Sequence, residues 1–115
     1  MGCNSVSLTG NLVRDGELRH TGKVAILNFT LAVDERRKDE AGKWYNNPVY
    51  VDCAMFGNRA MSVADSFTRG KKLTVDGRLT MRRWQADGKN YSKLAVLVDD
   101  FAYMSTPQQK EAQNG

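Results

Sequence analysis

The chain has 115 residues, two cysteines, one histidine and a formal net charge of +4. This length fits one domain with its own hydrophobic core. The positive charge alone favours a polyanionic partner only weakly. No residues have the spacing of a metal site or a redox motif, so we expect no metal and no cofactor.

Two further expectations concern the compartment. The start of the chain does not resemble a signal peptide, and no apolar run is long enough to span a membrane, so we expect a cytoplasmic protein without a membrane partner. Cys3 and Cys53 are expected to be thiols in a reducing cytosol. A disulfide between them is the alternative that the sequence leaves open.

Alternation of apolar and polar residues predicts three strands in the first half, over residues 4–13, 25–33 and 49–57. Gly10 interrupts the inner face of the first strand, where it would permit a bend or a close approach of another backbone. Residues 18–22 are expected to be short and irregular. The predicted inward-facing residues are Val6, Leu8, Leu12, Leu27, Phe29, Leu31, Val33, Val51, Cys53 and Met55.

Residues 34–47 are polar and too many for a tight turn, so we expect a functional or disordered loop. Trp44 lies near its end, where anchoring of the loop and a binding role are equally compatible with the sequence. Tyr50 and Phe56 share the outer face of the third strand and suggest a platform for stacking bases. Core packing or an oligomer contact is the alternative for Phe56.

The spacing changes to a helical period over residues 58–67, with Asn58 as the expected N-cap and Gly70 as the stop. This helix is predicted to plug the core through Ala60, Val63, Ala64 and Phe67. Strands are then predicted over 71–84 and 91–101. Their expected inner residues are Leu73, Val75, Leu79, Met81, Leu94, Val96 and Val98.

The two last strands are predicted to form one long hairpin, because Asp87-Gly88 between them is suited to a turn with positive φ. Its tip combines cations with aromatic rings: Arg82, Arg83, Trp84, Lys89 and Tyr91. An indole beside arginines would stack on a base while the charges hold phosphates. The alternatives are that Trp84 packs on Tyr91 across the hairpin and that the arginines form a solvated face.

The element order is three strands, a short helix and two strands. It predicts an all-β, five-stranded OB-fold Greek-key barrel with one short helix between strands 3 and 4, a fold that binds oligonucleotides on strands two and three. We assign residues 1–104 to this domain. Residues 105–115 are expected to be a short, polar, disordered tail.

Several segments then resemble bacterial-type single-stranded DNA-binding proteins: residues 4–15, 28–33, 50–57, 70–79 and Arg82-Arg83-Trp84. The similarity covers about residues 4–104. It implies an OB-fold homotetramer that coats single-stranded DNA with little sequence preference during replication, recombination and repair, on the nucleoid in the cytoplasm.

The resemblance also implies roles for individual residues: by position, bases would stack on Tyr50, Phe56 and Trp84, Tyr91 matches an aromatic of the same hairpin, and Arg82 and Arg83 match basic residues beside the tryptophan. We further expect Trp44 to stack in place of a missing loop aromatic, and Arg37, Arg78 and Lys89 to contact phosphates. Two positions depart from the family: Arg37 replaces a common loop tryptophan, and Asp52 stands where some members carry a cation. The family also ends in an acidic, hydrophobic tip that recruits replication and repair proteins. Residues 111–115 show no such tip, so either that tail lies outside this sequence or recruitment works differently.

Two other classes of function are alternatives to DNA binding. One is an OB-fold module for protein assembly or RNA binding, with weak DNA binding. The other is an enzyme, which we do not expect because the chain has a single histidine and because the adjacent Asp99 and Asp100 would point to opposite faces of a strand.

Overall fold

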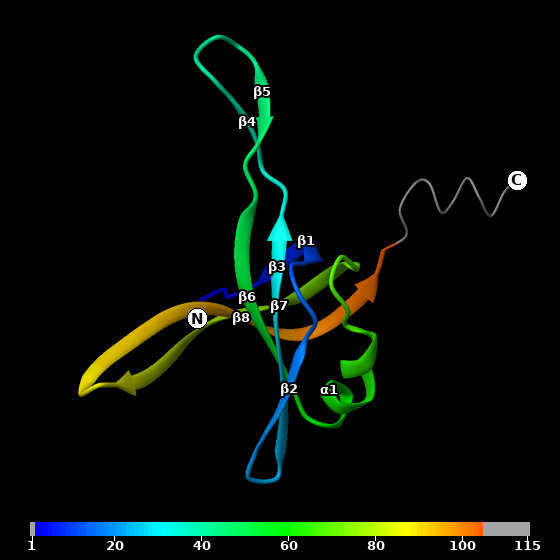
Figure 1. The fold of residues 1–115 in the computed structure, drawn as a ribbon, viewed down its shortest axis with the longest axis vertical. Helices are drawn as coiled ribbons and strands as arrows, with labels where there is room; N and C mark the ends of the chain where they lie inside the picture. Colours follow the sequence, from blue (N-terminus) through cyan, green and yellow to red (C-terminus); the bar gives the residue numbers. More distant parts are fainter. Residues whose placement is uncertain (1, 105–115) are drawn as a thin grey trace, which may run out of the picture.

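The computed structural model describes residues 2–104 (Figure 1). The elements in chain order are β1 (Val6–Leu12), β2 (Glu17–Thr21), β3 (Val24–Val33), β4 (Arg36–Lys38), β5 (Trp44–Asn46), β6 (Val49–Phe56), α1 (Asn58–Val63), the 3-10 turn η1 (Ala64–Ser66), β7 (Lys72–Ala86) and β8 (Lys89–Tyr103). In the described part of the chain, no helix is long and apolar enough to cross a membrane. The predicted disordered tail, 105–115, lies outside the described residues.

The main sheet has the strand order β1-β7-β8-β6-β3-β2, and it closes into a barrel because β1 also pairs with β3. The closing contact places Asn11 opposite Ala32 and Leu12 opposite Leu31. The five predicted strands correspond to β1, β3, β6, β7 and β8, with the helix between the third and the fourth of them. The predicted all-β OB-fold barrel is therefore confirmed, with three short strands in addition.

Two predictions of irregular backbone are wrong. Residues 18–22 belong mostly to β2, which pairs with the first half of β3. Residues 34–47 contain a second small sheet in which β4 pairs with β5. Every residue of β2, β4 and β5 is exposed. With no buried face, these strands lack the alternation by which a strand is predicted from sequence.

A single core fills the barrel. Leu27, Leu31, Leu73 and Val75 are completely buried. Phe67 follows η1 and meets the ring of Phe29 edge to face, with centroids 4.9 Å apart. The predicted plug is thus confirmed, but the predicted cap is wrong. Gly57 occupies the N-cap position, and no side chain caps α1.

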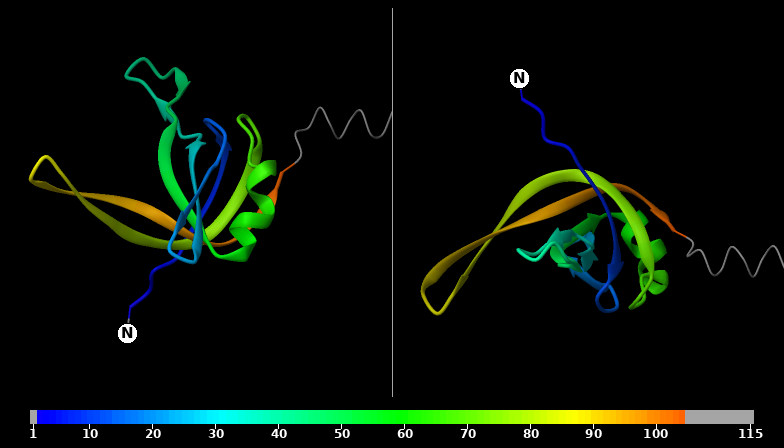
Figure 2. Two further views of the ribbon diagram at one scale, coloured as in Figure 1. Left: turned by 60° about the horizontal axis from the view of Figure 1, so that its bottom comes forward. Right: turned by 90° about the horizontal axis from the view of Figure 1, so that it is seen from above.

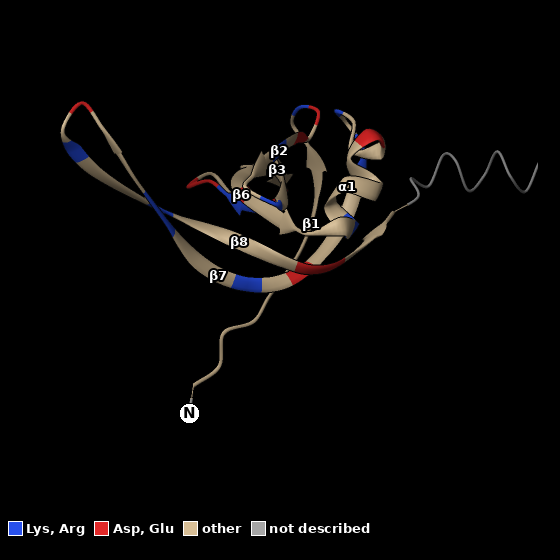
Figure 3. Ribbon diagram, turned by 90° about the horizontal axis from the view of Figure 1, so that it is seen from below, with Lys and Arg blue, Asp and Glu red and all other residues tan. Residues whose placement is uncertain are grey.

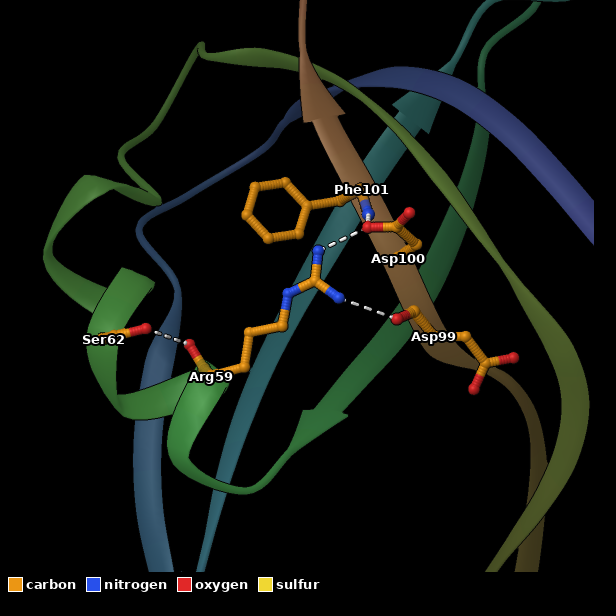
Figure 4. A network of polar contacts seen from close by, with 5 residues as sticks. All are labelled: Arg59, Ser62, Asp99, Asp100 and Phe101. Carbon is orange, nitrogen blue, oxygen red and sulfur yellow. Dashed lines mark hydrogen bonds and ion pairs between the residues drawn. The ribbon is translucent and has the colours of Figure 1, made fainter.

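Arg59 on α1 fastens this plug to β8 (Figure 4). Its Nη1 donates to the carbonyl oxygen of Asp99 at 2.9 Å, and its Nη2 pairs with the carboxylate of Asp100. The guanidinium also lies over the ring of Phe101, 5.0 Å from its centroid. This arrangement gives the carboxylate of Asp100 a structural role, whereas Asp99 contributes only its main-chain carbonyl to it.

The β4–β5 hairpin and the far half of the β7–β8 hairpin project from the barrel (Figures 1 and 2). The predicted Asp-Gly turn is confirmed, because Asp87 and Gly88 both have positive φ, 52° and 76°. Gly77 marks a register shift in β7–β8, and a Cβ there would lie 2.0 Å from the carbonyl oxygen of Leu97. The hairpin can therefore bend there only with glycine in this position.

The predicted inner face of this hairpin is only half right. Leu73 and Val75 are buried, whereas Leu79, Met81 and Leu94 are exposed. The pairing of β7 with β1 ends at Gly77, opposite Val6. Beyond that point the two strands leave the barrel. Apolar and polar residues still alternate along them, but the apolar side chains no longer face a core.

Two remaining predictions concern Gly10 and the cysteines. A Cβ at Gly10 would lie 2.6 Å from the carbonyl oxygen of Ala32, which confirms the close backbone approach. Cys3 is an exposed free thiol, and Cys53 is a buried free thiol. Burial, together with the charge of Asp52, raises the pKa of Cys53 to about 12. The disulfide alternative does not occur in this structure.

Candidate nucleic-acid interface

The outer face of β6 carries the first group of predicted site residues. Tyr50, Asp52, Ala54 and Phe56 alternate along the strand and share this face. The rings at its two ends are exposed, that of Phe56 by 50%. At about 3.3 Å per residue they lie ~20 Å apart. Phe56 is therefore not a core residue, which removes one of its two alternatives.

The projecting half of the β7–β8 hairpin carries the second group. Trp84 on β7 lies opposite Tyr91 on β8. Their rings are stacked, with centroids 5.6 Å apart and planes 16° from parallel. Each side chain still exposes nearly half of its surface, 48% for Trp84 and 42% for Tyr91. The pair thus packs across the hairpin and leaves aromatic surface in water.

The two groups meet at a hollow of about 350 Å³, here called the Trp84 hollow. It is lined by Asp52, Arg82, Arg83, Trp84 and Lys93. A second hollow, here called the Arg14 hollow, measures about 190 Å³. It is lined by Arg14, Asp15, Glu17, Asn28, Phe29, Thr30, Asp52, Cys53 and Arg82. Because Asp52 and Arg82 line both, the two hollows adjoin at these side chains, and together they are here called the groove over β3 and β6.

The predicted phosphate contacts differ in how far their charge is already compensated. Arg82 Nη1 donates to the neutral side chain of Asn28 at 2.9 Å. Arg83 makes no ion pair within residues 2–104. Arg78 pairs with Asp99 at 3.6 Å, and its exposed pair is a weak one. Arg82 is thus the cation best placed for an anion at the groove, because it shares the face of β7 that carries Trp84, whereas Arg83 lines the same hollow from the neighbouring position on the strand. Lys or Arg residues occur on both strands of this hairpin between the barrel and the tip (Figure 3).

Phe56 and Arg78 meet in a third hollow, which they line with Leu97, Val98 and Asp99. Arg82 does not line this hollow, but it lines a smaller one beside Phe56. A chain of hollows therefore runs along the outer face of the barrel from Phe56 past Arg82 to Trp84.

Three of the predicted residues lie away from this groove, and a fourth, Tyr50 on the outer face of β6, lines none of these hollows. Trp44 and Arg37 are on the β4–β5 hairpin, and Lys89 is at the β7–β8 turn. Trp44 is exposed, and the cations of Arg36 and Lys38 lie 5.6 and 5.7 Å from its ring centroid. It packs within its own hairpin. Arg37 lies opposite Tyr45 and pairs with Glu35 at 3.9 Å.

Sequence reasoning missed a polar network across the groove. Arg14 Nη2 donates to Thr30 Oγ1 at 3.2 Å, Thr30 Oγ1 donates to Asp52 Oδ1 at 2.9 Å, and Lys93 pairs with Asp52 Oδ2. The bond from Lys93 lowers the pKa of Asp52, with Thr30 adding to the effect against the cost of burial. The sequence contained one signal for this network, because Asp52 lies between the aromatic residues Tyr50 and Phe56 and a carboxylate there needs a neighbouring cation. The identity of that cation, Lys93, depends on the path of the β7–β8 hairpin, which the sequence does not show.

No three side chains of the metal-ligating kinds gather to hold an ion within residues 2–104. At the Trp84 hollow the groove combines an aromatic ring, three cations and the compensated carboxylate of Asp52, and at the Arg14 hollow Asp15 and Glu17 add two further carboxylates. Such a surface is suited to a flexible polyanion that carries flat, stackable groups.

Residues 3–104 match the profile of the Single-strand binding protein family. The single-stranded DNA-binding protein of Borreliella burgdorferi is 37% identical over 106 residues, which cover 90% of this chain and 70% of that protein.

Two solved structures show the same fold. A deletion mutant of the single-stranded DNA binding protein from Thermus aquaticus aligns with a TM-score of 0.80 and 30% identity, and this chain spans about half of its length, 52%. A Plasmodium falciparum protein, solved in complex with single-stranded DNA, aligns with a TM-score of 0.79 over 91% of this chain and 97% of its own. At 15% identity, the second likeness concerns the fold alone.

Proposed function

The chain belongs to the single-strand binding protein family, and from this premise we propose that it binds and coats single-stranded DNA with little sequence preference. The observation that carries the proposal is the Trp84 hollow. A half-exposed indole lies there beside Arg82, Arg83 and Lys93, outside a core that is already complete without it.

Binding combines two contributions. Cations at the groove neutralise phosphates and release counterions, so that affinity falls with salt with a slope of roughly −0.7 for each phosphate contacted on a single strand. Each base stacked on an aromatic ring adds about 1–3 kcal/mol whatever its identity. Trp84, Tyr91, Phe56 and Tyr50 are the proposed stacking rings, and Arg82 and Arg83 the proposed main phosphate contacts.

Strand selectivity follows from the same geometry. Duplex DNA buries its base faces in its own stack and offers only edges and phosphates to a protein. The exposed rings along the groove therefore favour a single strand. The less central residues, Trp44 and Arg37 on the β4–β5 hairpin, Arg78 beside Phe56 and Lys89 at the turn, would extend the contact with a longer strand.

The wider role belongs to the same proposal. We propose that the protein acts without catalysis in replication, recombination and repair, at the nucleoid in the cytoplasm. It would act as a homotetramer built on residues 1–104. Leu79, Met81 and Leu94 support self-association, because they leave apolar surface on the projecting hairpin in water.

The test is the mass of the protein in solution, measured with and without oligo-dT and, separately, with oligo-rU of the same length. We expect four chains per particle and a stable complex with oligo-dT. Absence of any complex would contradict DNA binding. Equal or tighter binding of oligo-rU would favour the RNA-binding alternative, because stacking alone does not distinguish ribose from deoxyribose.

A further inference from the structure

Among residues 2–104, Asp52 is the only carboxylate that lines the Trp84 hollow, whereas Asp15 and Glu17 line the Arg14 hollow with it. Asp52 thus lines both hollows. A strand that occupied both hollows would therefore contact Asp52. A negative charge at this place opposes phosphate binding unless a neighbouring cation compensates it.

The carboxylate is fixed in position. Thr30, which is buried, donates to Asp52 Oδ1 at 2.9 Å and accepts from Arg14 at 3.2 Å. The side chain of Asp52 itself is only 26% exposed. It cannot turn away from the groove without leaving a buried hydroxyl donor unpaired, which is costly.

Lys93 supplies the compensating charge. It reaches from β8, opposite Arg82 in the hairpin register, and pairs with Asp52 Oδ2. Its side chain is 59% exposed and lines the Trp84 hollow, so the ammonium is within reach of a bound strand. A phosphate and Asp52 would therefore compete for the same cation.

We propose that Asp52 is an internal competitor for phosphate, which holds Lys93 and so removes one cationic contact from the bound strand. The inference rests on the proposed function, since it concerns how that groove binds single-stranded DNA. It is specific to Lys93, because Arg82 is bonded to the neutral Asn28 and keeps its charge available. This chain consequently binds with lower affinity and a shallower salt dependence than the same groove without the carboxylate.

The primary test is Asp52→Asn, titrated with labelled oligo-dT at a series of salt concentrations. Asparagine keeps the size of the side chain and an acceptor for Thr30 but releases Lys93. We expect tighter binding at low salt and a slope of log K against log salt that is more negative by about 0.7, as one added phosphate contact requires. Unchanged or weaker binding with an unchanged slope would overturn the proposal.

Asp65→Asn is the matched charge control, because Asp65 is exposed on η1 and lines neither hollow of the groove. It raises the net charge by the same amount as Asp52→Asn. We expect it to leave the slope unchanged. An equal steepening in both variants would show a general effect of net charge and would contradict a role for the Asp52–Lys93 pair.

Lys93→Gln tests the pair from the other side and does not depend on the folding of the Asp52 variant. We expect weaker binding with an unchanged slope, because the strand then meets an uncompensated carboxylate. A slope shallower by about 0.7 would show that Lys93 already contacts phosphate and would overturn the proposal. In the double variant the slope should return to that of the unmodified protein.

These outcomes distinguish a failure of the proposed DNA binding from a failure of the proposed role of Asp52. If the unmodified protein does not bind oligo-dT, the proposed function itself is contradicted. If it binds and Asp52→Asn leaves its slope unchanged, only the role of Asp52 fails.

Discussion

Trp84 and Tyr91 lie directly opposite each other on β7 and β8, with their ring planes 16° from parallel. From the sequence, packing across the hairpin and stacking on a base were alternative roles for Trp84. The geometry of the pair is compatible with both roles at once. One ring supports the other, and nearly half of each side chain stays exposed. A base added to this pair would extend a stack whose geometry is already set.

The first prediction concerns this pair. Trp84→Ala should weaken binding of single-stranded DNA by about 1–3 kcal/mol, the range for one stacked base. Tyr91→Ala should also weaken it, because the indole loses the ring that holds its orientation. Anisotropy of labelled oligo-dT measures both. Met61→Ala, an exposed change on α1, is the control and should have no effect. Full affinity in Trp84→Ala protein would contradict the assignment of the indole.

The second prediction separates two phenylalanines that sequence alone does not rank. Phe67 is buried and packs edge to face on Phe29 and Phe101, so Phe67→Ala should lower the free energy of unfolding by about 3–5 kcal/mol. Phe56 is half exposed, so Phe56→Ala should cost far less stability and mainly weaken DNA binding. Denaturant unfolding and oligo-dT titration of both variants test the contrast. Similar losses of stability would show that Phe56 is packed in an oligomer contact.

The third prediction concerns pH. The pKa of Asp52 is lowered in the folded state, chiefly by the hydrogen bond from Lys93. A carboxylate of this kind stabilises the fold fully above its unfolded-state pKa of about 3.9 and loses the contribution as pH falls through the lower folded value. Thermal unfolding should therefore show Asp52→Asn less stable by a constant margin above about pH 5, with the gap closing below about pH 4. A gap that widens in acid would contradict the pair.

The fourth prediction concerns the thiols. Cys3 is exposed, whereas Cys53 is buried with its pKa raised to about 12, and reactivity requires the thiolate. Ellman's reagent should therefore titrate one thiol per native chain rapidly at pH 8 and a second only after denaturation. Absence of a rapidly reacting thiol under non-reducing conditions would instead indicate the Cys3–Cys53 disulfide.

The barrel strands were predictable because each has one face in the core. Leu27, Phe29 and Leu31 alternate with half-buried or polar neighbours, and the alternation identifies both the strand and its inner side. The same rule fails in β2 and β4, which are exposed throughout, and it misplaces Leu79, where the strand continues but the barrel ends. Alternation of apolar and polar residues thus predicts a strand, but it does not show whether the apolar face of that strand is buried in the core.

The candidate site likewise has some features that local sequence predicts and others that it does not. The exposure of Phe56 and Trp84 follows from their positions in local patterns. The joining of Asp52 to Lys93 depends on how far the β7–β8 hairpin bends across β6, which Gly77 and the register shift beside it determine. Partners more than forty residues apart have no local signature, so the compensated carboxylate appears only in three dimensions.

The most direct test of the central claim is the fluorescence of Trp84 in a Trp44→Phe variant. The chain has two tryptophans, so this change leaves Trp84 as the sole indole signal. The proposed groove predicts strong quenching by single-stranded oligo-dT, from a base stacked on the indole, and little quenching by a duplex of equal length at moderate salt. An unquenched signal at saturating oligo-dT, or equal quenching by the duplex, would contradict it.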